Sequence, residues 1–203
     1  MLNPVKTAVL VSGGGTNLQA LIDAAAAGSL KSAALSLVVA DKETAYALER
    51  AKRAGIPAAV VVRKGATQEA FEEKLSALLE ENGIELIVLA GFMCILSGAF
   101  TEKYENRIIN VHPSLIPSFC GKGFYGLKVH EAALSYGVKV TGATVHFVNE
   151  IPDGGKIIMQ SAVEVEEGDT PEILQRRVME RAEWKILPAS LEKVAADLLR
   201  KRQ

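Results

Sequence analysis

The sequence predicts a doubly wound α/β fold in which a mostly parallel β-sheet is covered by helices on both faces. Through residues 5–89, short apolar runs alternate with segments whose apolar residues follow a helical period. Continuous apolar strands are typical of sheets buried on both sides, and their alternation with helices is typical of βαβ units. After Gly91 the pattern changes to paired strands and a long helical segment. We therefore expect an antiparallel C-terminal part and a C-terminal helix.

The first part of the chain contains four expected strands, each a short apolar run bounded by turn residues. The strands are residues 5–11, 34–40, 58–62 and 86–89. The helices between them are residues 16–27, 43–54 and 68–82. Gly55 and Gly83 follow the second and third helices, where a residue in the left-handed conformation commonly ends a helix. Each strand–helix–strand unit should be right-handed.

The second part mixes helices and strands with one long loop. In order, we expect a helix-like connection at 92–104, a strand at 107–112, a loop at 113–126, a helix at 127–136, strands at 139–148 and 156–165 around a turn at 149–155, and a helical segment from 170 to about 199. Because proline lacks an amide hydrogen and crowds the preceding turn, Pro188 predicts a break in the last helix.

Composition argues against several functional classes. The 203 residues, 49% of them hydrophobic and 23% charged, suit one folded domain. A net charge of −1 provides no broad positive field for nucleic acid. No apolar run reaches the roughly 18–20 residues of a membrane span, and the short N-terminal apolar run is unlike a signal peptide. Cys94 and Cys120 have neither metal-ligand nor disulfide spacing, so we expect a reducing, cytoplasmic location.

A glycine-rich loop follows the first strand and opens the first helix: residues 12–17 read Ser-Gly-Gly-Gly-Thr-Asn. Glycines let backbone N–H groups approach an anion, and a helix N-terminus favours negative charge. The loop lacks the lysine of a Walker motif and the spacing of a dinucleotide fingerprint. It predicts either a site for one phosphate monoester or a tight turn in which Thr16 or Asn17 caps the helix. A side chain at Gly15 is expected to crowd a bound phosphate.

Asn110 and His112 lie at the end of the expected strand 107–112, directly before Pro113. Residues two apart in a strand project from the same face, so the amide and the imidazole should enter one cavity. An amide that donates to a developing oxyanion contributes about 10²–10³ in rate, and an imidazole can move protons near neutral pH. The pair predicts chemistry at a carbonyl group. The alternative is a strand end with a structural histidine.

Asp153 and the two other histidines have simple alternatives. Asp153 precedes two glycines, and Asp-Gly is first of all a turn signal. A carboxylate close to His112 would orient the ring and favour its charged form. His146, in the middle of a strand, is expected to be a hydrogen-bonded structural residue, and His130, at a helix start, is expected at the surface.

Six segments resemble one enzyme family over nearly the whole chain. They are Val-Leu-Val-Ser-Gly-Gly-Gly-Thr-Asn-Leu-Gln-Ala (9–20), Leu-Ala-Gly-Phe-Met (89–93), Ile-Leu-Ser (95–97), Asn-Val-His-Pro-Ser-Leu-Ile-Pro (110–117), Thr-Val-His-Phe-Val (144–148) and Asp-Gly-Gly (153–155). Together they resemble phosphoribosylglycinamide formyltransferase, a folate-dependent enzyme of purine synthesis, in register from about residue 5 to 195. Asn-x-His-Pro-Ser-Leu alone is shared by several formyl-transferring relatives, whereas its combination with the glycine loop is more specific.

The resemblance implies a Rossmann-like sheet that uses no dinucleotide, and it implies roles for individual residues. The catalytic trio is matched by Asn110, His112 and Asp153. Positions that hold the substrate's phosphate and ribose are matched by Gly14, Gly15, Thr16, Asn17 and Glu183. The folate pocket is matched by Met93, Cys94, Ile95, Leu96, Asn149, Glu150, Ile151 and Pro152. The implied formyl donor is 10-formyltetrahydrofolate, used as a co-substrate without a metal.

We accordingly expect residues 1–203 to form one formyltransferase domain, with a phosphate-binding half at about 1–100 and a folate-binding and catalytic half at about 101–203. The expected partners are small-molecule substrates, with no nucleic acid and no membrane, and the protein is a monomer or a homodimer. Three departures from the family concern affinity. Cys94 stands where relatives often carry Arg, Glu180 where they often carry Gln, and segment 120–126, with Lys122, is longer than in short relatives.

Three other functions remain open at this point. A hydrolase could release the formyl group to water with the same trio, without needing a phosphate loop. A methionyl-tRNA formyltransferase is expected to have a longer chain with a basic tRNA-binding domain. A nucleotide-binding module without catalysis would use the glycine loop and leave Asn110, His112 and Asp153 as a coincidence.

Overall fold

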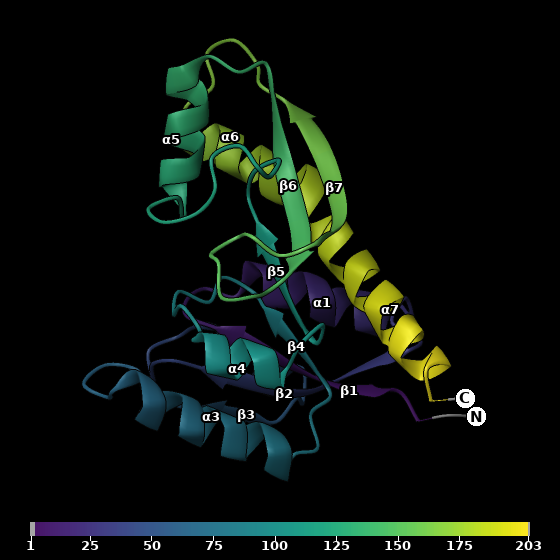
Figure 1. Ribbon diagram of the computed structural model, residues 1–203. Coiled ribbons are helices and arrows are strands. Elements are labelled where there is room, and N and C mark those ends of the chain that lie inside the picture. Colours follow the sequence, from purple (N-terminus) through teal and green to yellow (C-terminus); the bar gives the residue numbers. More distant parts are fainter. Residues whose placement is uncertain (1–2, 203) are drawn as a thin grey trace.

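The structure, a computed structural model, describes residues 3–202 and contains a seven-stranded sheet with the order β3-β2-β1-β4-β5-β6-β7 (Figure 1). The strands are β1 (Val5–Val11), β2 (Ala33–Ala40), β3 (Ala58–Val60), β4 (Leu86–Leu89), β5 (Ile108–His112), β6 (Val140–Phe147) and β7 (Ile157–Glu164). Strands β1 to β5 are parallel, whereas β6 and β7 are antiparallel to their neighbours. The predicted parallel sheet with an antiparallel C-terminal part is confirmed, although β3 is shorter than expected.

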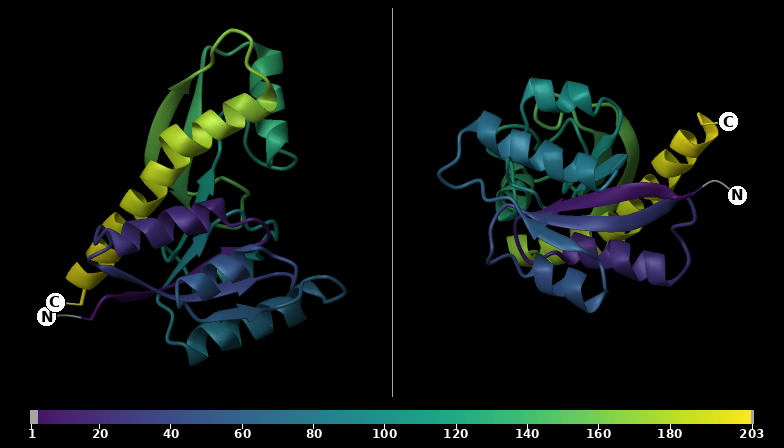
Figure 2. Two further views of the ribbon diagram at one scale, coloured as in Figure 1. Left: turned by 180° about the vertical axis from the view of Figure 1, so that it is seen from behind. Right: turned by 90° about the horizontal axis from the view of Figure 1, so that it is seen from below.

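Helices cover both faces of the sheet (Figure 2). They are α1 (Thr16–Ala26), α2 (Ala47–Arg53), α3 (Gln68–Glu81), α4 (Gly98–Lys103), α5 (Leu127–Tyr136), α6 (Pro171–Val178), the π-helix η1 (Met179–Glu183) and α7 (Trp184–Arg200). Leu21 of α1 belongs to the same buried cluster as Val9, whereas Phe71 of α3 belongs to the cluster of Leu10. Because Val9 and Leu10 are neighbours in β1, successive side chains of one strand supply the two cores. The doubly wound arrangement is confirmed.

The expected helix at 92–104 is wrong for its first half, since only α4 is helical there. Two side chains of α3 hold the preceding stretch in a non-helical conformation. Gln68 donates a hydrogen bond to the carbonyl of Ile95 at 3.0 Å. Glu72 accepts one from the N–H of Ser97 at 2.6 Å. These contacts satisfy backbone groups that a helix would have paired internally.

The prediction that Pro188 breaks the C-terminal helix is also wrong. Pro188 is the fifth residue of α7, which continues through it, and the irregular turn is η1, immediately before α7. A proline crowds the carbonyl four residues earlier, which here belongs to Trp184, the first residue of α7 after the irregular turn. No helix within residues 3–202 is long and apolar enough to cross a membrane.

The helix expected from residue 43 begins only at Ala47, because the preceding residues form a turn. The N–H of Ala47 donates to the carbonyl of Gly13 at 3.1 Å. The start of α2 is therefore attached to the glycine loop that follows β1.

Gly142 allows β6 and β7 to approach each other, and we expect Gly142→Ala to unfold the protein more easily. A Cβ at this position would lie 2.0 Å from the carbonyl oxygen of Ser161. Relieving such overpacking typically costs about 1–3 kcal/mol, so the urea midpoint should fall. Ala162→Ser is the control, since Ala162 is exposed and pairs with Gly142. Equal unfolding free energies for Gly142→Ala and its parent would contradict this prediction.

Candidate active site

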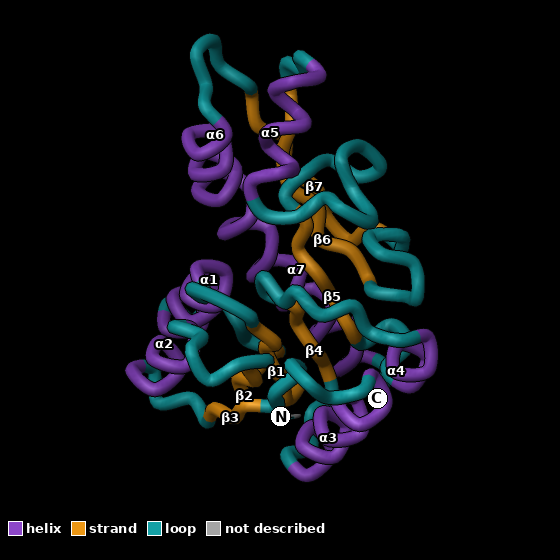
Figure 3. The backbone as a smooth tube through the Cα atoms, turned by 90° about the vertical axis from the view of Figure 1, so that its left-hand side faces the viewer, coloured by secondary structure: helices purple, strands orange, loops and turns teal. Residues whose placement is uncertain are grey.

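A cavity of about 850 Å³ lies at the carboxyl ends of β4 and β5, beside the loop that follows β1. Figure 3 shows that loops surround these strand ends. Strand β1 lies between β2 and β4, so the strand order reverses there: β2 and β3 follow on one side of β1, and β4 and the later strands follow on the other. In open α/β sheets, ligands bind in the crevice that forms at such a switch point.

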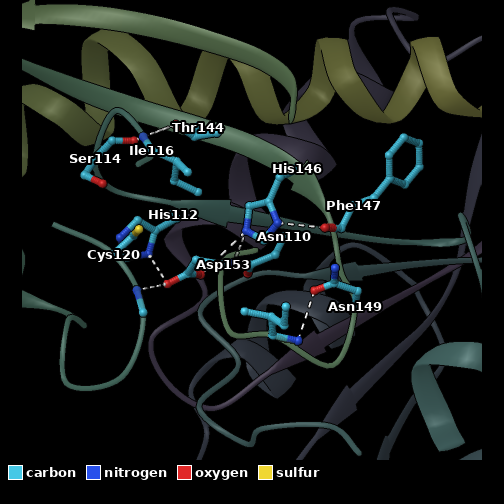
Figure 4. A network of polar contacts seen from close by, with 12 residues as sticks. Asn110, His112, Ser114, Ile116, Cys120, Thr144, His146, Phe147, Asn149 and Asp153 are labelled. Atoms are coloured by element: carbon cyan, nitrogen blue, oxygen red, sulfur yellow. Dashed lines mark hydrogen bonds and ion pairs between the residues drawn. The ribbon is translucent and has the colours of Figure 1, made fainter. Parts of the chain in front are cut away.

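Asn110 and His112 enter this cavity from the end of β5, as the strand pattern predicts. The antiparallel register of β5 and β6 places Asn110 opposite His146. The amide nitrogen of Asn110 lies 3.2 Å from Nε2 of His146, while Nδ1 of His146 lies 2.8 Å from the carbonyl oxygen of Phe147 (Figure 4). The Phe147 carbonyl can only accept, so Nδ1 carries the hydrogen and Nε2 accepts from Asn110.

His146 therefore has more than the structural role predicted for it. Its hydrogen bonds are those of a structural histidine, but they also set the orientation of the Asn110 amide. Register across an antiparallel pair is the signal that reveals this contact, and it requires knowing which strands pair.

Asp153 approaches the two histidines from the turn between β6 and β7 (Figure 4). Its Oδ2 lies 3.5 Å from Nδ1 of His112, and its Oδ1 lies 3.6 Å from Nε2 of His146. Asp153 has a φ of 57°, which an Asp tolerates better than most residues. A Cβ on Gly155 would lie 1.7 Å from the carbonyl oxygen of Phe147, so this glycine is required for the turn to close. The turn interpretation of Asp153 is correct, and the turn brings its carboxylate to His112.

Segment 118–126 contacts the same two groups from the other side. Nε2 of His112 lies 2.9 Å from the carbonyl oxygen of Phe119, and the N–H of Gly121 donates to Oδ2 of Asp153 at 2.8 Å. Phe119 offers only an acceptor, so Nε2 of His112 carries a hydrogen. Lys122 also lines the cavity.

Burial and charge act in opposite directions on this pair. Burial lowers the pKa of His112, while the charge of Asp153 and the Phe119 carbonyl act to raise it. Burial would raise the pKa of Asp153, but the contact with His146, the charge of His112 and the hydrogen bond from the Gly121 N–H hold it below its usual range. Asp153 is therefore ionised at neutral pH. His112 is poised to gain a proton when further negative charge develops beside it.

The expectation that His130 lies at the surface is wrong. His130 is fully buried and lines the cavity, and neither ring nitrogen has a hydrogen-bond partner within residues 3–202. Burial, and secondarily the charge of His112, lower the pKa of His130 to about 4. The helical period of 127–136 is the signal that could have located it, because Val129 and Ala133 occupy the same packed side of α5.

The glycine loop and the far end of the chain meet at one end of the cavity. Thr16, Asn17 and Glu183 line it, whereas Gly14 and Gly15 are not among its lining residues. Gly15, not Thr16 or Asn17, is the N-cap residue of α1. Asn17 donates from its amide to Oε2 of Glu183 at 2.7 Å. Burial raises the pKa of Glu183, and the Asn17 bond acts against this shift.

The predicted folate-pocket residues all line the cavity, four from the segment after β4 and four from the turn after β6. Met93 and Ile95 are exposed apolar side chains, 54% and 64% accessible. The thiol of Cys94 donates to Asp41, and burial raises the pKa of Cys94 to about 12. Cys94 is thus a neutral part of the cavity wall.

Two further expectations concern groups around the cavity. Glu180 pairs with Arg176 at 3.8 Å and is not among the residues that line the cavity. Within the described part of the chain, no three His, Cys, Asp or Glu residues are grouped so as to hold a metal ion. Metal-free chemistry stays a prediction.

Comparisons with known proteins identify the family of the chain. A family model described as formyl transferase matches residues 5–191. The trifunctional purine biosynthetic protein adenosine-3 of Gallus gallus is 49% identical over 196 residues, which are 96% of this chain and 19% of that protein. The chain thus spans about a fifth of the length of this relative.

Two relatives are similar over most of their length. Phosphoribosylglycinamide formyltransferase of Haemophilus influenzae is 41% identical over 184 residues, which are 90% of this chain and 84% of that protein. The crystal structure of phosphoribosylglycinamide formyltransferase from Brucella melitensis has a TM-score of 0.86 and 43% identity, covering 96% of this chain and 97% of that one. The chain therefore belongs to the formyl transferase family, whose phosphoribosylglycinamide formyltransferases it resembles over nearly its whole length.

Proposed function

We propose that the protein transfers the formyl group of 10-formyltetrahydrofolate to the amine of 5′-phosphoribosylglycinamide, yielding formylglycinamide ribonucleotide and tetrahydrofolate in purine biosynthesis. The observation that carries this proposal is one cavity lined by Asn110, His112 and Asp153 and, at one end, by Thr16, Asn17 and Glu183. The first group supplies carbonyl chemistry. The second supplies a helix N-terminus for a phosphate and a carboxylate for the rest of the acceptor.

In the proposed reaction, the amine attacks the formyl carbon and a tetrahedral intermediate forms. The Asn110 amide and Nε2–H of His112 donate to its oxyanion. In the structure this hydrogen of His112 points to the Phe119 carbonyl, so the formyl oxygen replaces Phe119 as the acceptor. His146 keeps the Asn110 amide oriented through the bond described above.

Asp153 supports the reaction through His112. As the oxyanion develops, the ionised carboxylate 3.5 Å from Nδ1 stabilises the imidazolium form of the ring. Asp153 also helps to relay a proton, through water, from the attacking amine to the leaving folate nitrogen. Holding both substrates in one cavity supplies the remaining acceleration through proximity.

The donor is proposed to bind against Met93, Cys94, Ile95 and Leu96 on one side and the turn of Asn149, Glu150, Ile151 and Pro152 on the other. Exposed apolar side chains suit a flat heterocycle, and the backbone of both segments offers hydrogen-bonding groups. The Cys94 thiol, which is neutral, contributes no charge to this contact.

We further propose that residues 1–203 act as one formyltransferase domain, in which about 1–100 serve mainly phosphate binding and about 101–203 mainly folate binding and catalysis. A cytoplasmic location is supported by the free thiols of Cys94 and Cys120, since disulfides are rare in a reducing compartment. The proposed partners are small molecules, and the protein acts as a monomer or a homodimer.

A single assay tests the proposal. Purified protein is mixed with 10-formyltetrahydrofolate, with and without phosphoribosylglycinamide, and the appearance of tetrahydrofolate is followed. Release that depends on the amine is expected. Release of tetrahydrofolate without the amine would identify a formyl hydrolase. If no tetrahydrofolate is released, a nucleotide-binding module without catalysis is the remaining function.

Gly15→Val is expected to weaken binding of the phosphorylated acceptor about tenfold and to lower stability. The sequence-based reason, crowding of the phosphate, is not the one that the geometry supports. A Cβ at Gly15 would lie 2.7 Å from Cβ of Ala47, and the residue has a φ of 72°. The variant should therefore displace the loop from α2.

Calorimetric titration and thermal unfolding measure the two effects of Gly15→Val. Gly14→Ala is the control for stability, because a Cβ there meets no atom within 4 Å. If Gly15→Val binds the acceptor with unchanged affinity, this loop does not bind the phosphate.

A further inference from the structure

Two carbonyl groups of the glycine loop accept hydrogen bonds from α2. Gly13 accepts a hydrogen bond from the N–H of Ala47 at 3.1 Å. Gly14 accepts one from Nε of Arg50 at 2.7 Å. In a trans peptide the C=O and the following N–H point in opposite directions. Contacts that turn these two carbonyls toward α2 therefore turn the N–H groups of Gly14 and Gly15 away from it.

We propose that Arg50 is a positioning residue for the acceptor's phosphate. It orients the loop so that backbone N–H groups face the anion. Its positive charge, on the α2 side of the loop, also stabilises the bound anion. This inference rests on the proposed function, because it assigns a ligand to the loop. The first N–H groups of α1 have no partner inside the helix and add to the same surface.

Arg50 is itself fixed in place. Nη1 donates to Oε1 of Gln19 at 2.9 Å, and the guanidinium carbon lies 5.2 Å from the centre of the Tyr46 ring. The backbone N–H of Gln19 in turn donates to the carbonyl of Gly15. A Cβ on Gly15 would lie 3.4 Å from Cδ of Arg50, so the stem of the side chain also packs on the loop. One guanidinium thus links α2, the loop and α1.

The charges around the cavity make this contribution important. Among the described residues that line the cavity, Lys122 is the only Lys or Arg, and Glu183 adds a carboxylate at the acceptor end. A phosphate here depends mainly on backbone N–H groups, whose orientation Arg50 controls. Arginine suits this task because its fork can donate to two acceptors at once.

Arg50→Met tests the proposal, with Arg53→Met as the matched control. Arg53 lies on the same helix and also over the Tyr46 ring, but its Nε is paired with Glu49 and not with the loop. For each variant, calorimetry measures the affinity for phosphoribosylglycinamide and for the same compound without its phosphate. Turnover and thermal unfolding are measured alongside.

Arg50→Met should bind the phosphorylated acceptor about tenfold more weakly, since a hydrogen bond to a charged group is lost. It should bind the dephosphorylated compound within about twofold of the parent, and kcat at saturation should change equally little. Arg50→Lys keeps the charge without the Nε donor and should restore part of the affinity. Arg53→Met should match the parent.

Two results would overturn the role of Arg50 alone: unchanged affinity for the phosphorylated acceptor, or equal weakening for both compounds, which marks a merely structural contact. If Arg50→Met fails to fold, Arg50→Lys decides the matter by the same comparison. If the parent protein binds both compounds equally well, the loop holds no phosphate. That result overturns the acceptor assignment of the proposed function together with this inference.

Discussion

His112→Ala is expected to lower kcat by at least about a hundredfold while leaving nucleotide affinity nearly unchanged. In the proposed function the ring supplies the donor that faces the developing oxyanion, and its Nε2 hydrogen already points to an acceptor, the Phe119 carbonyl, at 2.9 Å. Alanine removes this donor and the proton that the ring can gain. The glycine loop and Glu183, which hold the acceptor in the proposed function, do not depend on the imidazole.

Single-turnover kinetics with both substrates saturating measures this loss directly. Calorimetric binding of phosphoribosylglycinamide to the same variant is the internal control, because a misfolded protein would lose binding as well as turnover. Turnover within about tenfold of the parent would remove His112 from the mechanism.

Asp153→Asn is expected to lower kcat by a similar factor, at least about a hundredfold. In the parent, the Asp153 charge raises the pKa of His112 against the effect of burial. A neutral amide removes this opposing charge, so the pKa of His112 should fall further and the imidazolium should become harder to form. The Gly121 N–H can still donate to the amide oxygen, so the local fold should be retained.

Titration of the His112 ring signal by NMR tests the second half of this prediction. The ring should remain neutral to a lower pH in Asp153→Asn than in the parent. A pKa that stays the same or rises would show that the carboxylate acts in another way.

Much of the fold is predictable because local patterns and global topology agree. The buried strands of a parallel sheet are continuous apolar runs, such as residues 86–89, and each is followed by a turn that only a few residue types allow. Asn110 and His112 share a strand face for the same local reason. Their presence in one cavity therefore follows from a period of two residues.

Features that depend on distant contacts are not predictable in this way. The segment before α4 avoids a helix because Gln68 and Glu72 bond to its backbone. Its own sequence contains no sign of them. Likewise, the Asp-Gly sequence predicts a turn at Asp153 but does not predict that the Gly121 N–H donates to its carboxylate. His130 is buried with Val129 and Ala133, although its polar ring alone favours a place at the surface.

The bond between Asn17 and Glu183 joins residues 166 positions apart. A ribosome makes the glycine loop before Asn110, His112 and Asp153, and it makes all of these before Glu183, the partner of Asn17. Domains generally begin to fold from the N-terminal side during synthesis. A nascent chain that stops before residue 183 can therefore contain Asn110, His112 and Asp153 yet lack the carboxylate that the proposed function assigns to the acceptor. In the proposed function, the acceptor site is therefore complete only after Glu183 has been synthesised.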